Sequence, residues 1–275
     1  MFYPIHMGTI LITGASAGIG EALARKFHSQ HHQVVCLARR KKRIETLAQE
    51  LNQLRPNSAL AIQCDVNDSE NLNSAINQSL SHFKSIDGFI ANAGFGIAGN
   101  AEILQLTDYR RQFETNVFSV VQSFLLVKNA LTQSKGFFTV IGSVNSYLSL
   151  PTASAYAMSK FAVRAFCDAI YWEMKPKNVS VTLACPGFIE TEIRKVNNLG
   201  EFKKESKDPI PNWLMMSSEK AAAQIYTAST NRKKEVIITF HGKILVLISR
   251  FMPWILNPLM KRLIKNRNHW NESGL

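Results

Sequence analysis

Short apolar runs alternate along the chain with segments whose apolar positions recur at helical spacing. The first run, Thr9-Ile10-Leu11-Ile12, passes through a glycine-rich turn into a helical pattern that begins near Glu21. Later runs predict further strands at Gln33 to Ala38, Ala59 to Cys64, Gly88 to Asn92, Phe137 to Ile141, Ser180 to Cys185 and Glu235 to Thr239. Because strands that alternate with helices form parallel sheets covered on both faces, this order predicts a doubly wound α/β fold.

Composition agrees with one globular domain. The 275 residues are 46% hydrophobic and 19% charged, and no linker, internal repeat or low-complexity tract divides them. The four cysteines stand apart in apolar segments, so we expect buried, reduced thiols. His28 and His32 have a spacing that metal ligands use, but no third ligand is near them, and we expect both on the surface.

The glycine-rich turn reads Thr13-Gly14-Ala15-Ser16-Ala17-Gly18-Ile19-Gly20. Gly14 permits the tight turn, while Gly18 and Gly20 allow backbone N–H groups and the helix N-terminus to approach a pyrophosphate. A loop without a ligand is the alternative. No Lys-Ser or Lys-Thr pair closes the motif, which excludes a Walker-type phosphate loop.

Tyr156 and Lys160 stand four positions apart, one turn along the same helix face. A cation near a phenol stabilises its phenolate and so makes the phenol a better proton donor. The same spacing also occurs on many solvated helices, so the pair alone does not establish chemistry.

Together the glycine turn and this pair resemble the short-chain dehydrogenase/reductase family over roughly residues 8 to 240. Further matches are Asn92-Ala93-Gly94 after a strand, Asn116 in the next long helix, Ser143 after a later strand, and Pro186-Gly187 followed by Thr191. The resemblance implies a Rossmann-like single catalytic domain over residues 1–240, with a substrate lid at about 188–217. Residues 241–275 lie beyond the resemblance, and their own pattern of apolar and basic residues predicts a C-terminal amphipathic extension.

The resemblance also implies roles for individual residues. Tyr156 would be the general acid that protonates a carbonyl oxygen, and Lys160 would lower its pKa and hold the nicotinamide ribose. Ser143 would orient the carbonyl, and Asn116 would fix a water that relays protons; a strand-end cap and a satisfied helix residue are their structural alternatives. The cofactor-binding residues would be Gly14, Ser16, Gly18, Ile19, Gly20, Arg39, Arg40, Asp65, Val66, Asn92, Ala93, Gly94, Tyr156, Lys160, Pro186, Gly187, Ile189 and Thr191.

The end of the second strand favours NADP(H) over NAD. An NAD-preferring relative would have a carboxylate at Ala38, whereas Arg39 offers a donor fork suited to a 2′-phosphate. A solvated basic start to the next helix is the alternative. Relatives often carry a basic residue at the position of Ala17, which this chain lacks. Because no aromatic residues are interleaved with Arg39 to Arg43, we expect no nucleic-acid partner.

The segments expected around the substrate are apolar. The lid contains Phe188, Ile189, Ile193, Leu199, Phe202, Trp213, Leu214, Met215 and Met216, and no arginine after Ser143 is placed to clamp a carboxylate. We expect NADPH-dependent reduction of a lipophilic carbonyl, such as a fatty acyl, sphingoid, sterol or retinoid-like compound. Two alternatives stay open: an NAD-linked alcohol dehydrogenase of the same fold, and a non-catalytic nucleotide-sensing protein.

The C-terminal stretch is apolar and basic. From Val236 to His269 there are six cations and no Asp or Glu, within a formal net charge of +12. Arg250 and two prolines interrupt any run that could span a bilayer, so the pattern favours an interfacial helix pair on an anionic membrane. The alternatives are packing over the substrate pocket and pairing with a partner subunit in a homo-oligomer. No charged leader precedes the glycine turn, which predicts a cytoplasmic enzyme with its extension on a membrane surface.

Overall fold

The computed structural model of the chain describes residues 8–192, 210–256, 258 and 261. These residues form one parallel sheet of seven strands in the order β3-β2-β1-β4-β5-β6-β7. The strands are β1 Thr9–Thr13, β2 Gln33–Ala38, β3 Ala59–Gln63, β4 Gly88–Ala91, β5 Phe137–Ile141, β6 Ser180–Cys185 and β7 Glu235–Ile237. The predicted doubly wound, Rossmann-like fold is confirmed.

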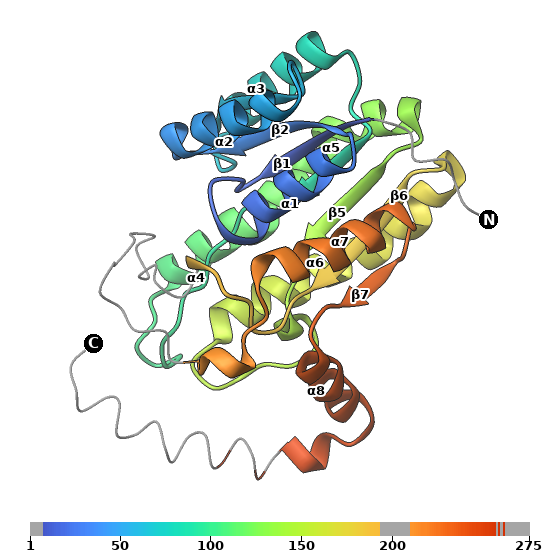
Figure 1. Cartoon of the computed structure of the whole chain (residues 1–275). Helices are drawn as coiled ribbons and strands as arrows, with labels where there is room; N and C mark the ends of the chain where they lie inside the picture. The colour runs from blue at the N-terminus through green and yellow to red at the C-terminus, as the bar shows by residue number, and fades with distance from the viewer. Residues whose placement is uncertain (1–7, 193–209, 257, 259–260, 262–275) are drawn as a thin grey trace.

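Helices cover both faces of this sheet (Figure 1). One face carries α1 Gly18–Ser29, α2 Lys41–Leu54 and α7 Ser218–Thr230, and the other carries α3 Ser69–Phe83, α5 Ser119–Ser134 and α6 Ser154–Met174. Two more helices, α4 Leu106–Phe113 and α8 Phe240–Phe251, lie outside these layers, and α8 follows the carboxyl end of β7.

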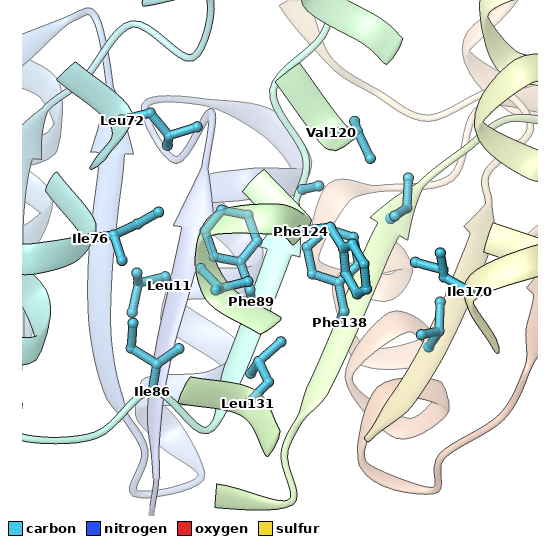
Figure 2. Packing of buried hydrophobic residues seen from close by; sticks show 14 of the residues in the cluster. Leu11, Leu72, Ile76, Ile86, Phe89, Val120, Phe124, Leu131, Phe138 and Ile170 are labelled. Atoms are coloured by element: carbon cyan, nitrogen blue, oxygen red, sulfur yellow. The ribbon is translucent and has the colours of Figure 1, made fainter. Parts of the chain in front are cut away.

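The core consists of two apolar layers because successive side chains of a strand point to opposite faces. In β1, Ile10 and Ile12 pack with α1, α2 and α7, whereas Leu11 packs with the layer that contains α3, α5 and α6. In that second layer Phe138 stacks on Phe89 at 5.6 Å and meets the edge of Phe124 at 5.5 Å between ring centroids (Figure 2). These buried rings fix α5 against the centre of the sheet.

The cysteines are buried and unpaired, as predicted, and burial raises the pKa of Cys36 to about 12, so its thiol stays protonated. The prediction of surface histidines was wrong: His28 and His32 are 6% and 4% exposed. A ring nitrogen of His28 lies 2.7 Å from the Ser58 hydroxyl, and the His32 ring packs edge-on against Phe27. Both histidines are therefore packed inside the protein near the start of β2.

The strand order reverses between the neighbouring strands β1 and β4: β2 and β3 follow β1 toward one edge of the sheet, and β5, β6 and β7 follow β4 toward the other edge. In open α/β sheets, ligands bind in the crevice outside the carboxyl ends of the strands at such a reversal. The loops after β1, β4, β5 and β6 all begin at the carboxyl ends of the strands, and they contain the glycine turn, Asn92-Ala93-Gly94, Ser143 and Pro186-Gly187.

Candidate active site

The turn after β1 has the backbone geometry that only glycine accommodates well. Gly14 and Gly18 have φ values of +67° and +56°, in the left-handed region. A Cβ on Gly20 would lie 2.4 Å from the Gly14 carbonyl oxygen, so any side chain there would displace the turn. The turn thus brings the N-terminus of α1 close to the crevice, where its N–H groups can receive an anion.

Thr13 and Asn92 lock this turn to the loop after β4. The Thr13 hydroxyl accepts hydrogen bonds from the backbone N–H groups of Asn92 and Ala93, both at 3.0 Å. The Asn92 amide donates in return to the Thr13 carbonyl at 2.8 Å. Thr13 was not among the predicted site residues, although its position at the end of β1 could have indicated that it belongs to the site.

Asn116 lies on a π-helical turn, η1 Glu114–Phe118, between α4 and α5. Such turns are rare and often occur at functional sites, because the extra residue turns one side chain out of helical register. Asn116 is 1% exposed; its amide oxygen accepts from the Phe95 N–H at 3.2 Å, and its nitrogen donates to the Phe95 carbonyl and to the Ser159 hydroxyl. This side chain ties the β4 loop to α6; its predicted water relay stays a prediction.

Lys160 and Tyr156 project from the first half of α6. Lys160 is 7% exposed, and its ammonium donates to the Ile141 carbonyl at 2.8 Å and lies 5.6 Å from the centroid of the Tyr156 ring. Burial lowers the pKa of Lys160 to about 8. Tyr156 is half-buried, and Gly96 of the β4 loop packs against its ring, since a Cβ on Gly96 would lie 3.5 Å from it.

Ser143 follows β5 and begins a short 3-10 turn, η2 Val144–Ser146. Its hydroxyl accepts a hydrogen bond from the Asn145 N–H at 3.1 Å, so the capping alternative is realised. Because the hydroxyl acts there as an acceptor, its own proton is left to donate to another group. Ser143 is half-buried, like Tyr156, whereas Asn116 and Lys160 are buried. The two residues predicted to touch substrate are therefore the accessible ones.

The arginines after β2 differ in their surroundings. Arg39 is exposed, and no side-chain partner for it occurs in the described part of the chain. Arg40 instead donates to the Ser16 hydroxyl at 3.0 Å and pairs with Glu192 at 2.7 Å, and Arg43 pairs with the same carboxylate. Partial burial opposes ionisation of Glu192, but the two guanidinium groups hold its pKa below the ordinary value. Arg40 is thus engaged at the mouth of the glycine turn.

Other predicted cofactor contacts lie at the same edge. After β3, Val66 is buried, and the Asp65 carboxylate accepts from the Asn67 N–H at 3.0 Å. After β6, Pro186 is buried, and Thr191 packs on the glycine turn, where a Cβ on Gly18 would lie 3.1 Å from its methyl group. A cavity of about 490 Å³ is lined by residues that include Gly18, Thr191 and Glu192; its lining does not include Ser143, Tyr156 or Lys160.

Both ends of the expected lid are held together. The Glu190 N–H donates to the Met216 carbonyl at 2.9 Å, and the Met216 N–H donates to the Phe188 carbonyl at 3.0 Å. Ile189 is 3% exposed between these bonds. The lid residues Ile193, Leu199 and Phe202 lie outside the described residues.

Helix α8 contacts both the lid and the loop after Ser143. A ring nitrogen of His241 accepts a hydrogen bond from the Phe188 N–H at 3.2 Å, and the two rings stack with centroids 5.3 Å apart. Val246 of the same helix packs with Val144 and Leu148. The first part of the C-terminal extension is therefore a wall beside the candidate site. Sequence patterns gave no signal for His241, because its partner is distant along the chain.

Two negative findings concern the described residues alone. Within residues 8–192 and 210–256, no three His, Cys, Asp or Glu side chains come together as a metal site would require. In the same part of the chain, no helix has the length and apolar character needed to cross a bilayer.

The comparisons with known proteins point in one direction. The family model of the short chain dehydrogenases matches residues 8–201. "Dehydrogenase/reductase SDR family member 7B" of Xenopus tropicalis is 30% identical over 235 residues, which cover 83% of this chain and 76% of the relative. "11-beta-hydroxysteroid dehydrogenase A" of Sesamum indicum is 30% identical over 195 residues, or 70% of this chain and 56% of that one.

Solved structures share the fold. An alcohol dehydrogenase from the archaeon Thermococcus sibiricus, complexed with 5-hydroxy-NADP, superposes with a TM-score of 0.74 at 24% identity, covering 84% of this chain and 96% of its own. A short chain dehydrogenase/reductase from Burkholderia phymatum in complex with NAD gives a TM-score of 0.79 at 20% identity, covering 90% and 93%.

Proposed function

This chain belongs to the short chain dehydrogenase family and is thus an oxidoreductase, and from that premise we propose that it reduces the carbonyl of a lipophilic substrate with NADPH. The observation that carries the proposal is the arrangement on α6. There the half-buried Tyr156 lies beside the buried ammonium of Lys160, at the crevice onto which the glycine turn opens.

The residues at the crevice fit a dinucleotide. The left-handed backbone at Gly14 and Gly18 and the close contact of Gly20 with Gly14 fold the turn tightly against the N-terminus of α1, whose N–H groups would receive the pyrophosphate. The loops with Asn92 and Thr191 would border the diphosphate and nicotinamide portions. When bound, the cofactor supplies the hydride that adds to the carbonyl carbon.

The preference for NADPH rests on the end of β2. Ala38 is buried and offers no carboxylate for ribose hydroxyls, while Arg39 beside it is exposed. Its guanidinium group suits a 2′-phosphate, and Arg40 with Ser16 would form the other side of that site. Because Glu192 pairs with Arg40, we take Arg39 as the main determinant of the preference for NADPH.

Proton delivery is the task of the chain's own side chains. Reduction places negative charge on the carbonyl oxygen, which therefore needs hydrogen-bond donors and a proton. The Ser143 hydroxyl would orient that oxygen, and Tyr156 would donate its phenolic proton to it. The Lys160 charge would stabilise the phenolate that remains, and Asn116 would keep α6 in position against the β4 loop through Ser159.

An apolar substrate is favoured by the wall that follows Ser143. Val144 and Leu148 pack with Val246 of α8, and Tyr147, Leu150 and Leu245 adjoin them. Phe188, at the start of the expected lid, stacks on His241. The relative from Sesamum indicum is named a hydroxysteroid dehydrogenase, and a steroid is a lipophilic compound.

The test is NADPH oxidation with ketones graded by chain length, with NADH and with small keto acids run in parallel. Burial of each added methylene should raise kcat/KM by up to about four-fold until the wall is filled. Faster turnover of small acids, or equal rates with NADH, would overturn the substrate or the cofactor assignment. No NADPH oxidation with any ketone would favour the non-catalytic alternative.

A further inference from the structure

Helix α8 exposes one apolar face. Seen along the helix at about 100° per residue, its four exposed apolar residues fall within roughly 60° and lie opposite Gly242 and Val246, which are buried. We name the outer stripe as these four together with two that follow: Phe240 (77% exposed), Ile244 (43%), Leu247 (56%), Phe251 (62%), Trp254 (64%) and Ile255 (43%).

Cations flank the outer stripe. Lys243 and Arg250 are exposed, share one side of α8, and have no ion-pair partner within the described ranges. No Asp or Glu occurs from Val236 to His269 to neutralise them. The outer face of α8 is therefore both apolar and uniformly positive.

We propose that the outer stripe docks this protein on an anionic lipid surface. A helix at a membrane interface places its apolar face at the acyl boundary and extends lysine and arginine side chains to the headgroups. Phe251 and Trp254 are aromatic residues of the kind that occupy this zone. The proposal goes beyond the reductase activity and does not depend on it.

Charge argues against a second copy of the chain as the occupant. A twofold contact pairs the same patch with itself, so Lys243 and Arg250 of each copy would approach the like charges of the other. An anionic leaflet instead attracts both cations. The inner face of α8 packs on Val144 and Leu148, so docking would bring the substrate wall next to the lipid.

Substitutions test this better than removal of the helix. A chain that ended near Gly242 would also lose Val246 from its contact with Val144 and Leu148, and would not isolate the outer face. The variant Leu247→Ser/Phe251→Ser/Trp254→Ser changes exposed residues only. Its matched control, Leu54→Ser/Ile103→Ser/Leu106→Ser, removes side chains that are 79%, 63% and 64% exposed elsewhere.

The measurement is co-sedimentation of the full chain with phosphatidylcholine vesicles, with and without added phosphatidylserine, at low and high salt. The wild type and the control should bind the mixed vesicles, bind neutral vesicles less, and dissociate as salt rises, since attraction is screened over about 10 Å at 0.1 M. The outer-stripe variant should remain mostly in the supernatant with an unchanged folded CD spectrum.

Removal of the two cations is an independent test of docking. Lys243→Gln/Arg250→Gln should weaken binding about five-fold per charge removed, while the exposed pair Lys84→Gln/Lys177→Gln should change it much less. Equal binding of the outer-stripe variant and its control would overturn the proposal, as would equal binding to neutral vesicles. So would a wild-type dimer that the outer-stripe variant converts to a monomer without loss of vesicle binding.

Discussion

The Lys160 ammonium donates a hydrogen bond to the Ile141 carbonyl over 2.8 Å, and this bond ties α6 to the end of β5 just before Ser143. The lysine is 7% exposed, so its charge is poorly solvated. Because desolvation disfavours the charged form, the ammonium loses its proton more easily than on the surface. The residue proposed to stabilise the Tyr156 phenolate is therefore itself sensitive to pH.

The first prediction concerns that sensitivity. Burial lowers the pKa of Lys160 to about 8, so its positive charge is present below this value and is lost as pH rises through it. The reductive kcat/KM should accordingly be level below about pH 8 and decline above it. In Lys160→Arg the positive charge persists at high pH. The pH profile of kcat/KM for this variant should therefore lack the inflection near pH 8, even if its absolute rate is lower. A profile that keeps the inflection in Lys160→Arg would assign it to another group.

The second prediction isolates the proton donor. Tyr156→Phe removes one oxygen and its proton and leaves the ring that packs on Gly96, so NADPH binding should be nearly normal. Ketone reduction should fall by about 100-fold or more. Tyr171→Phe is the matched control, because that ring contacts Lys175 and Lys234 away from the site. If Tyr156→Phe retains more than about a tenth of the wild-type rate, Tyr156 is not the general acid.

The third prediction concerns cofactor choice. Arg39→Asp reverses the charge beside the expected 2′-phosphate, so it should weaken NADPH far more than NADH. The quantity to measure is the ratio of kcat/KM for the two cofactors. Lys42→Asp makes the same charge change three residues later, in the first turn of α2, and should leave the ratio nearly unaltered. Equal losses for both cofactors in Arg39→Asp would leave Arg39 as part of a solvated helix start.

Short-range patterns were enough to predict the strands and the turns between them. Consecutive apolar residues such as Ile10 and Leu11 specify a strand buried on both faces, and the glycines of the turn indicate a local backbone requirement. Strand ends were less accurate: β7 ends at Ile237 because the Thr239 hydroxyl caps α8, accepting from the Gly242 N–H.

Contacts between distant segments could not be predicted from those patterns. His28 was expected on the surface, yet Ser58 from the segment before β3 covers it. The pairing of Arg40 with Glu192 joins residues 152 positions apart, and no local pattern encodes it. The family resemblance predicted that the candidate residues lie near the carboxyl ends of the strands. It did not predict their hydrogen bonds, because these depend on three-dimensional packing.

The fourth prediction tests the link between α8 and the lid. His241→Ala removes the acceptor of the Phe188 N–H and the stacked ring, so the turn at Gly187 should lose support. The loss of one hydrogen bond of about 1 kcal/mol would raise KM for the ketone about five-fold. His241→Gln, which keeps an acceptor, should restore most of the loss. If Gln and Ala behave alike, the stacking contact matters rather than the hydrogen bond.

The fifth prediction concerns stability in acid. Burial lowers the pKa of both His28 and His32, and the nearby Arg55 adds to this effect. The folded state therefore resists protonation, whereas the unfolded chain binds protons near the ordinary value of about 6.5. Above about pH 6.5 the two histidines do not reduce the free energy of unfolding. As pH falls below that value, the free energy of unfolding should decrease by up to about 1.4 kcal/mol per pH unit for each histidine.

Urea unfolding between about pH 8 and about pH 5.5 measures that loss as a shift in the free energy of unfolding. His28→Gln and His32→Phe should be less stable at neutral pH, because each disturbs a packed ring, but their stability should depend less steeply on pH. His82→Gln, an exposed site, is the control and should keep the wild-type slope. If both buried-site variants keep the wild-type slope, the acid sensitivity arises elsewhere, because a group that does not titrate cannot contribute to the difference in bound protons.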